Sequence, residues 1–354
     1  MNTVNYSIEV ITPCFCAGAK ADQQAEIRAP SIRGQLRWWF RTLGGFKALA
    51  AQGKTLRQQE SDIFGNAAGN SGTASRLVVR VAGSPNTSLR SQTSKDPDGM
   101  DARMGSDRGY LLFPLRKKPR GVFDLSTPPR FQLCVQWRGP TEQWIDIQSL
   151  VTIFGNLGSL GFRSRRAMGA LAFESEALDL ASSLSRFTAS PALLLRQLRA
   201  ASSRDAISVL ARWLKGWRAH GRTADHQRAQ PPEPPHNPGF KFARNDHDAG
   251  FNRNVPETYR PALGLPIIQR YGTGNISNWE FGSGNPAEPK GRFASPVLLR
   301  PHRDAQGNWH ALVIFVDAHK WPEGKPVFLN GQPRTVSRDL YEAMKKDPNL
   351  KPFP

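Results

Sequence analysis

Residues 131–175 read FQLCVQWRGPTEQWIDIQSLVTIFGNLGSLGFRSRRAMGALAFES, and this stretch decides the fold class. Apolar side chains occupy every second position from Phe131 to Trp137, which predicts a strand with one buried face. Apolar residues then recur at helical spacing, and a run rich in glycine and arginine separates them from a second apolar run. The stretch therefore predicts a strand at 131–137, a helix at 141–154, a loop at 155–169 and a strand at 170–175.

The residues before this stretch supply the rest of the pattern. They predict a strand at 4–12, a helix at 31–43 with Ser31 as its N-cap, strands at 76–82 and 109–115, and a loop at 84–109. The order strand, helix, strand, strand, helix, strand is typical of the ferredoxin-like split βαβ fold. The predicted fold class is therefore α+β, and RNA-recognition domains share this architecture, although a fold by itself does not assign a function.

The second half of the chain has a weaker pattern. Leucine and tryptophan at helical spacing predict a helical segment, and QPPEPPHNP predicts an exposed proline-rich loop. These residues alone leave open whether the second half repeats the fold of the first. The predicted elements are the helical segment at 190–219, the proline-rich loop at 221–239, strands at 294–300 and 309–318, and a terminal helix at 334–346.

The charge of the chain indicates the class of its partner. Among 354 residues, 48 are Lys or Arg and 29 are Asp or Glu, which gives a formal net charge of +19. Such an excess indicates a polyanionic partner, which is nucleic acid, an anionic membrane surface or an acidic protein. No stretch approaches the roughly 18 apolar residues that span a bilayer, and no secretory signal opens the chain. We therefore expect no membrane association.

Cysteine usage indicates a reducing compartment. The chain has three cysteines, so they cannot all pair with one another. The spacing of Cys14 and Cys16 lacks both the CxxC form and the second pair that a zinc site needs. We expect a cytoplasmic protein without a bound metal.

The predicted first helix carries a ridge of arginines. Arg33, Arg37 and Arg41 lie four residues apart, so their guanidinium groups line one side of the helix. No acidic residue within the helix offsets their repulsion, whereas an RNA backbone laid along the ridge would do so. Trp38 lies beside the ridge and is placed to stack on a base. The alternative is a solvated basic helix whose acidic partners come from the rest of the fold.

The loop rich in glycine and arginine is the second candidate site. Glycines let backbone amides approach a phosphate closely, and arginines supply charge and paired donors. The loop is not the phosphate loop of nucleotide triphosphatases, because it lacks GxxxxGK[ST] and follows a helix. The alternative is a flexible surface loop. Its residues of interest are Gly155, Gly158, Gly161, Gly169, Arg163, Arg165 and Arg166.

Several motifs occur in an order typical of one family. They are ITPCFCAGA (11–19), EIRAPSIRGQLRWWFR (26–41), IFGN (63–66) and GSLGFRSRRAMGAL (158–171). Together they resemble the RAMP superfamily of CRISPR proteins, most closely the family of first subunits of the Cmr (type III-B) RNA-targeting effector complex. LGLPI (263–267) and RFASPVLLRP (292–301) resemble the C-terminal half of that family.

This resemblance implies two ferredoxin-like (RRM-like) domains with long loop insertions. The first RAMP domain is expected at 1–175, and a second, more divergent one at 176–354 with the helical insertion and the proline-rich loop. The resemblance also implies an RNA-binding subunit of a ribonucleoprotein that acts in antiviral defence against foreign RNA. Its expected partners are guide RNA and single-stranded target RNA near the guide 3′ end, and other Cmr-complex subunits. No cofactor is expected.

The helix and loop motifs of the family, together with Trp38, give the predicted RNA-binding residues. Ser159 and Ala167 depart from the family, which usually has glycine at both positions, and the substitutions stiffen the loop. The predicted residues are Arg28, Ser31, Arg33, Arg37, Trp38, Arg41, Gly158, Gly161, Arg163, Ser164, Arg165, Arg166 and Gly169.

The resembled subunit binds RNA without cleaving it, so we expect no enzymatic activity. Two alternatives stay open. One is a RAMP ribonuclease that processes guide RNA, or that cleaves target RNA with a divalent metal held by Asp22. His247, between two aspartates in NDHDAG, is the other catalytic candidate, although this triplet is more typical of a turn. The second alternative is a basic module that docks an acidic protein within the complex.

Overall fold

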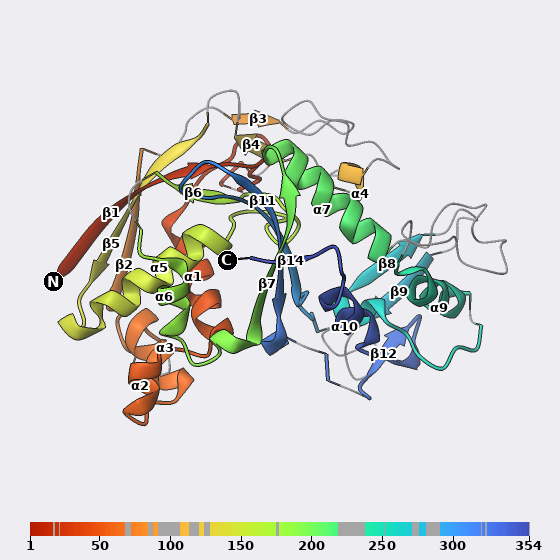
Figure 1. Cartoon of the computed structure of the whole chain (residues 1–354). Coiled ribbons are helices and arrows are strands. Elements are labelled where there is room, and N and C mark those ends of the chain that lie inside the picture. The colour runs from red at the N-terminus through yellow and green to blue at the C-terminus, as the bar shows by residue number, and fades with distance from the viewer. Residues whose placement is uncertain are drawn as a thin grey trace. The chain divides into compact units, whose positions relative to one another are not determined.

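The structure is a computed structural model of the chain (Figure 1). It describes residues 1–16, 18–20, 22–67, 72–83, 88–90, 107–112, 120–123, 128–174, 177–218, 238–251, 253–270, 276–280, 291–319, 321–322 and 324–353. The chain divides into two compact units. The first takes Met1–Leu210, Leu299–Ile314 and Phe353, and the second takes Ala211–Leu298 and Phe315–Pro352. A domain boundary at residue 175 stays a prediction.

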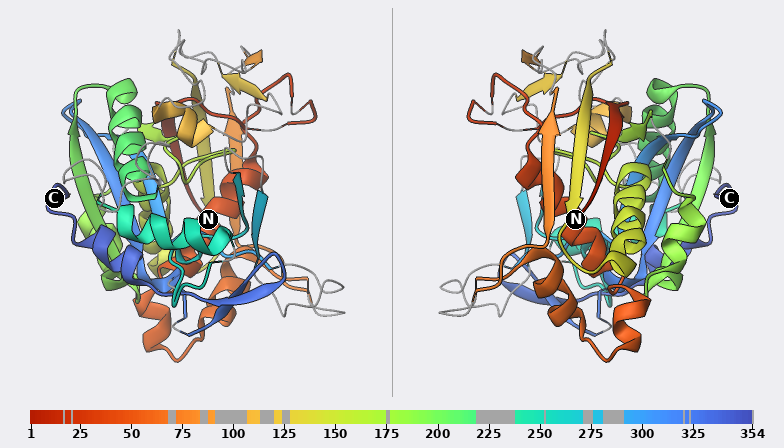
Figure 2. Two further views of the ribbon diagram at one scale, coloured as in Figure 1. Left: turned by 90° about the vertical axis from the view of Figure 1, so that its right-hand side faces the viewer. Right: turned by 90° about the vertical axis from the view of Figure 1, so that its left-hand side faces the viewer.

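The first sheet holds β1 (Asn2–Val10), β2 (Leu77–Ala82), β5 (Arg130–Trp137) and β6 (Leu171–Phe173). Its order is β2-β5-β1-β6, and each neighbouring pair is antiparallel (Figure 2). The register sets Tyr6 opposite Leu133, so that alternate side chains of adjacent strands share one apolar face. The predicted strands at 4–12, 76–82, 131–137 and 170–175 are confirmed, and so is the mixed α/β architecture.

Helices α1 (Ala29–Thr42) and α5 (Trp144–Leu157) contact each other, and each contacts a strand of this sheet. The first turn of α1 contains Pro30, which fits there because the first backbone N–H groups of a helix have no partner in the helix. Arg28 holds the N-cap, so the prediction of Ser31 as the cap is wrong. The short helices α2 (Lys47–Ala51), α3 (Leu56–Phe64) and α6 (Leu180–Ser185) belong to the same unit.

The predicted strand at 109–115 is wrong. Helix α4 (Asp107–Leu112) occupies its described part, with Leu111 and Leu112 buried. A short apolar run has no period that separates a strand from a helix, so tertiary packing decides between them. Strands β3 (Ser88–Arg90) and β4 (Gly121–Phe123) pair antiparallel nearby in the sequence. Most of the predicted loops at 84–109 and 221–239 lies outside the described residues.

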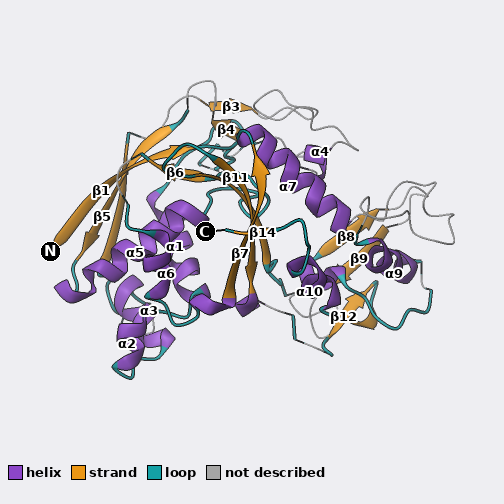
Figure 3. Ribbon diagram, viewed as in Figure 1, coloured by secondary structure: helices purple, strands orange, loops and turns teal. Residues whose placement is uncertain are grey.

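A second sheet has the order β10-β11-β7-β14. Its strands β7, β11 and β14 are labelled in Figure 3. The predicted strands at 294–300 and 309–318 are confirmed as β10 and β11. The helical segment predicted at 190–219 is correct only from α7 (Ser203–Arg218) onward, because the residues before it form β7. The strands are β7 (Leu193–Ala200), β10 (Val297–Arg303), β11 (Trp309–Val316) and β14 (Lys351–Pro352).

The second unit contains a third sheet, of order β13-β12-β9-β8. Its strands are β8 (Ile267–Arg270), β9 (Ile276–Glu280), β12 (Pro326–Leu329) and β13 (Gln332–Thr335), and its helices include α9 (Phe240–Gly250) and α10 (Asp339–Lys345). The predicted terminal helix at 334–346 is therefore shorter than expected. Single 3-10 turns lie at Thr141–Gln143, Ser190–Ala192, Arg260–Leu263 and Asp317–His319. Among the described helices, none has the length and apolar character needed to cross a membrane.

Candidate nucleic-acid interface

Helix α1 buries one side and leaves its arginines on the other. Ile32, Leu36, Trp39 and Phe40 are buried, at the spacing of one helical stripe. The Phe40 ring packs edge-on against Phe64 of α3, with ring centroids 5.7 Å apart. This packing brings the arginine side of α1 next to α3.

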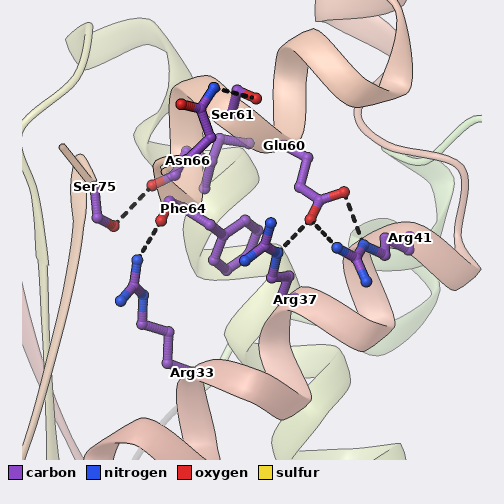
Figure 4. A network of polar contacts seen from close by, with 9 residues as sticks. Arg33, Arg37, Arg41, Glu60, Ser61, Phe64, Asn66 and Ser75 are labelled. Atoms are coloured by element: carbon purple, nitrogen blue, oxygen red, sulfur yellow. Dashed lines mark hydrogen bonds and ion pairs between the residues drawn. The ribbon is translucent and has the colours of Figure 1, made fainter. Parts of the chain in front are cut away.

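All three arginines of the predicted ridge contact α3 (Figure 4). Arg33 donates from Nη2 to the carbonyl oxygen of Phe64, the last residue of α3. Arg37 donates from Nε to Oε1 of Glu60. Arg41 donates from Nε to Oε2 of Glu60 at 2.7 Å, and from Nη2 to Oε1. One carboxylate therefore joins two of the three arginines.

Glu60 is the acidic partner that α1 itself lacks. Burial by itself raises the pKa of the Glu60 carboxyl, but the hydrogen bonds from Arg41 and Arg37 outweigh burial and bring the pKa below its usual value. The hydrogen bond between Arg41 and Glu60 also raises the pKa of Arg41. An acidic partner from outside the helix, which the sequence analysis gave as the alternative to RNA, is therefore present for Arg37 and Arg41. RNA contact by these arginines stays a prediction.

The contact between Arg165 and Trp38 brings the two predicted sites together. The Cζ atom of Arg165 lies 5.0 Å from the centroid of the Trp38 ring. Trp38 is half-buried and stands edge-on to Trp39. Arg28 and Ser31 are exposed at the beginning of the same helix. The helix and the loop, which are separate in sequence, therefore meet in the first unit.

Backbone hydrogen bonds anchor the glycine- and arginine-rich loop to the segment that follows β1. Phe162 pairs with Phe15 in an antiparallel bridge. Gly169 donates to the carbonyl oxygen of Pro13 at 2.9 Å, and its own carbonyl accepts from the Leu160 amide at 2.8 Å. A Cβ atom at Gly169 would lie 1.9 Å from the Leu160 carbonyl oxygen. Only glycine permits this approach of backbone to backbone.

The other loop glycines also serve close packing. Gly161 has a φ of +80°, and a Cβ atom there would lie 2.7 Å from the Phe15 carbonyl oxygen. A Cβ atom at Gly158 would lie 2.5 Å from the Phe154 carbonyl oxygen. These glycines therefore let the chain pack against itself. Their close approach to a phosphate stays a prediction.

The two departures from the family pattern keep the path of the loop. Ala167 has a φ of +68°, which is the left-handed conformation that glycine favours, and its amide donates to the Leu299 carbonyl oxygen at 2.9 Å. An L-residue in this conformation costs about 1 kcal/mol. Ser159 is buried and pairs with Ala170 in an antiparallel bridge. The loop therefore accommodates a residue other than glycine at both positions.

The arginines of the loop differ in their environments. Arg163 and Ser164 are half-buried, and Arg163 has a φ of +65°. Burial lowers the pKa of Arg165. Arg166 is buried and donates from Nη1 to the carbonyl oxygen of Arg165 at 2.9 Å. Arg163 and Arg165 are thus more accessible than Arg166 to an external phosphate.

Sequence reasoning missed Arg300, whose side chain binds backbone carbonyl oxygens at both ends of this loop. Its fully buried guanidinium donates from Nη2 to the carbonyl oxygens of Gly155, at 2.7 Å, and Leu171, at 2.6 Å. Its Nε donates to the carbonyl oxygen of Gly158 at 2.9 Å. Burial lowers the pKa of Arg300 to about 9. The only sequence signal was its place within RFASPVLLRP.

Sequence reasoning also missed Arg120. Its Cζ atom lies 4.5 Å from the centroid of the Phe162 ring, so a further guanidinium reaches the loop. Arg120 directly precedes β4, in a segment for which the sequence predicted no element. The contact depends on tertiary structure, and no local pattern signals it.

The face of the first sheet that points away from the apolar side is polar. The register of β1, β2 and β5 sets hydroxyl, amide, thiol and guanidinium side chains there beside Val78 and Ala82, with no aromatic ring at the outward positions of these described strands. Aromatic stacking of bases on this face therefore finds no support. Its residues include Asn5, Ser7, Arg80, Gln132, Cys134 and Gln136.

The two catalytic candidates, Asp22 and His247, belong to different compact units of the chain. Asp22 is exposed, and the described residues contain no group of three His, Cys, Asp or Glu that could hold a metal. His247 lies within helix α9, so the predicted turn is wrong, and its ring packs against Phe251. Asp246 accepts hydrogen bonds from the amides of Tyr259, at 2.7 Å, and Arg260, at 3.0 Å, as a structural carboxylate.

The cysteines of the first segment lie in the core. Cys14 and Cys16 are buried, with their Sγ atoms 3.0 Å apart. The hydrogen bond with Cys16, followed by burial, raises the pKa of the Cys14 thiol well above its usual value. Both thiols are therefore small core side chains.

Comparison with known proteins finds a family match for the first part of the chain. Residues 7–172 match the model of the RAMP superfamily. Two curated proteins of Pyrococcus furiosus are similar to this chain. CRISPR system Cmr subunit Cmr1-1 is 29% identical over 170 residues, which are 47% of this chain and 46% of that protein. Subunit Cmr1-2 is 27% identical over 177 residues, which are 47% of this chain and 92% of that protein.

The similarity in sequence therefore spans less than half the length of Cmr1-1. The similarity in fold spans more of the chain. The crystal structure of Cmr1 from Pyrococcus furiosus in its apo form superposes with a TM-score of 0.55 at 16% identity, covering 99% of this chain and 98% of that one. Residues 7–172, slightly less than half of the chain, are therefore similar to the RAMP superfamily, and the fold of the chain is similar to that of Cmr1.

Proposed function

We propose that this protein is an RNA-binding subunit of a type III-B CRISPR (Cmr) ribonucleoprotein. In this role it contacts guide RNA or single-stranded target RNA near the guide 3′ end, beside other Cmr subunits, in defence against foreign RNA. The observation that carries the proposal is the contact of Arg165 with Trp38, because it joins two arginine-bearing elements into one surface. The net charge of +19 supports a polyanionic ligand.

The architecture supports the finer assignment of a ferredoxin-like RAMP domain to the first part of the chain. An antiparallel sheet of order β2-β5-β1-β6, with α1 and α5 each following a strand, has the connectivity of a split βαβ unit. We propose a second, divergent domain of this kind for the remainder. We also propose that the subunit binds RNA without cleaving it.

A salt titration tests this function. The full-length protein is titrated with labelled single-stranded RNA with and without Mg²⁺ or Mn²⁺, and the RNA is then examined on a denaturing gel. We expect tight retention that weakens steeply with salt, and intact RNA under all conditions. Metal-dependent cleavage that disappears in Asp22→Ala would instead make the protein a nuclease. Absence of both binding and cleavage would favour the docking module.

A comparison of ligands separates RNA recognition from plain charge attraction. Because Trp38 offers one half-buried ring beside the arginines, we expect single-stranded RNA to bind more tightly than duplex DNA of equal length. Equal affinity for both would reduce the interaction to nonspecific attraction of phosphates.

A further inference from the structure

Glu60 lies at the point where α3 meets two arginines of α1. Its carboxylate accepts hydrogen bonds from Arg37 and from Arg41 (Figure 4). The Glu60 side chain is 12% exposed, whereas the side chains of Arg37 and Arg41 are 39% and 54% exposed. The acid is therefore on the inner side of the cluster, and the guanidinium groups are on the side that solvent reaches.

The position of Glu60 is fixed by the way α3 is held. Thr55 and Gln58 form a capping box at the beginning of α3. Next to Glu60, the buried side chain of Gln59 accepts from the Phe46 amide at 2.9 Å and donates to the Lys54 carbonyl oxygen at 3.0 Å. The carboxylate therefore projects from a helix that is secured at its beginning and along its length.

The hydrogen bonds of Glu60 leave donor atoms of both arginines available. Glu60 engages Nε of Arg37, and Nε and Nη2 of Arg41. Within the described part of the chain, both Nη atoms of Arg37 and Nη1 of Arg41 make no hydrogen bond. A guanidinium has five N–H donors, so one group can bond a carboxylate on one edge and a phosphate on another.

We propose that Glu60 is a positioning residue for RNA phosphate. It orients Arg37 and Arg41 so that their remaining Nη donors bind the phosphodiester backbone together. The pair keeps a net charge of +1 after Glu60 is counted, so it still attracts a phosphate. The repulsion between the two arginines, which lie four residues apart on one helix, is relieved before RNA arrives. This inference rests on the proposed RNA-binding function.

The substitution Glu60→Gln distinguishes positioning from simple electrostatics. It raises the net charge from +19 to +20, so electrostatics alone predicts tighter RNA binding. If Glu60 positions the arginines, Glu60→Gln should instead bind RNA about tenfold more weakly than the wild type. A loss of this size corresponds to one hydrogen bond to a charged group. The measurement is the salt titration with labelled single-stranded RNA. Tighter or unchanged binding by Glu60→Gln overturns the proposal.

Asp62 provides a matched control on the same helix. It pairs with Lys54 at 2.6 Å instead of with an arginine of α1, and its substitution Asp62→Asn raises the net charge equally. We expect Asp62→Asn to leave RNA affinity unchanged or to tighten it slightly. A loss equal to that of Glu60→Gln would show that any lost acid on α3 has the same effect, and would overturn the proposal.

A double-mutant cycle tests whether Glu60 acts through the arginines. In an Arg37→Ala/Arg41→Ala background, Glu60→Gln should not change RNA affinity further. A persisting tenfold loss in that background would show a general structural effect and overturn the proposal. If the double alanine variant itself binds RNA as tightly as the wild type, the proposed function of α1 fails, independently of Glu60.

A second variant covers the case in which Glu60→Gln does not fold. Arg41→Lys keeps the charge, but a lysine ammonium cannot present a fork to the carboxylate and the phosphate together. We expect it to weaken RNA binding, while Arg57→Lys, at an exposed position of α3, does not. Equal binding by both lysine variants would overturn the proposal.

Discussion

Arg300 donates a hydrogen bond of 2.9 Å from Nε to the carbonyl oxygen of Gly158, which is the C-cap residue of α5. The same guanidinium reaches the carbonyl oxygen of Gly155 within the last turn. The carbonyl groups at the end of a helix have no partners within the helix and carry partial negative charge. The buried guanidinium of Arg300, from β10, therefore caps the C-terminal end of α5, where the arginine-bearing loop begins.

Replacing Arg300 should destabilise the first unit. Arg300→Met removes the donors used by four carbonyl oxygens, at Gly155, Gly158, Leu171 and Pro301. Because unsatisfied buried acceptors each cost free energy, we expect the free energy of unfolding to fall by about 3 kcal/mol. Urea denaturation followed by circular dichroism measures this change. Arg300→Lys should recover part of it, and an unchanged denaturation midpoint in Arg300→Met would contradict the role assigned to Arg300.

His302 should make stability depend on acid. Nη1 of Arg300 lies 3.1 Å from Nδ1 of His302, and because a guanidinium only donates, Nδ1 accepts and carries no proton. Burial, with a further contribution from the charge of Arg300, lowers the pKa of His302 to about 3. In the unfolded chain the pKa of histidine is about 6.5. Between these two values the unfolded state binds a proton that the folded state does not, so stability falls as pH falls.

The variant His302→Gln isolates this effect. From pH 7 to pH 5 we expect the wild type to lose about 2 kcal/mol more stability than His302→Gln. Urea midpoints at both pH values give the difference. Burial raises the pKa of the Asp246 carboxyl to about 6, so this group also titrates in the range. Asp246 and the other titrating groups are present in both proteins, so their contributions cancel in the difference. Parallel loss in both proteins would show that His302 does not titrate as described.

The parts of the fold that the sequence predicted are those with a strict local period. Alternation from Phe131 to Trp137 predicts β5 because one face of that strand is buried and the other is polar. Residues 193–200, LLLRQLRA, have no such contrast, and all but one are half-buried. They form β7 because of pairing within a sheet whose neighbouring strand β11 lies more than a hundred residues away in sequence. No local pattern contains that information.

The candidate site also has features that the local sequence predicts and contacts that it does not predict. The apolar stripe of α1 predicts which face is buried, and therefore where its arginines lie. The acid that pairs with Arg41 is 19 residues away, and the cation that supports Gly158 is 142 residues away. Both contacts join elements that are distant in the sequence and therefore depend on tertiary packing. The sequence could identify the charged residues, but not which of them are already paired within the protein.

Gly34 should be a position where alanine stabilises the protein. It lies inside α1, and a Cβ atom there would meet nothing within 4 Å. Glycine inside a helix costs about 1 kcal/mol relative to alanine, so Gly34→Ala should raise the free energy of unfolding by about this amount. Urea denaturation measures it. Gly53 is the control, because it is equally open but has a φ of +77°, so Gly53→Ala should destabilise. Destabilisation by Gly34→Ala would contradict the open environment at this position.

Arg33 and Arg41 should respond differently to alanine substitution, although they are equivalent in the sequence pattern. Arg33 donates to the Phe64 carbonyl oxygen at the end of α3, so Arg33→Ala should lower stability by about 1 kcal/mol. Arg41 is 54% exposed and, by the proposed function, contacts phosphate, so Arg41→Ala should lower the slope of log affinity against log salt by up to about one.

Urea denaturation and the RNA salt titration, applied to both variants, separate these effects. If Arg33→Ala reduces the salt slope as much as Arg41→Ala does, the whole ridge contacts RNA and the contact of Arg33 with α3 opens when RNA binds. If neither variant changes the slope, RNA does not bind along α1. The remaining positive charge of the loop, at Arg163 and Arg165, then becomes the place to test.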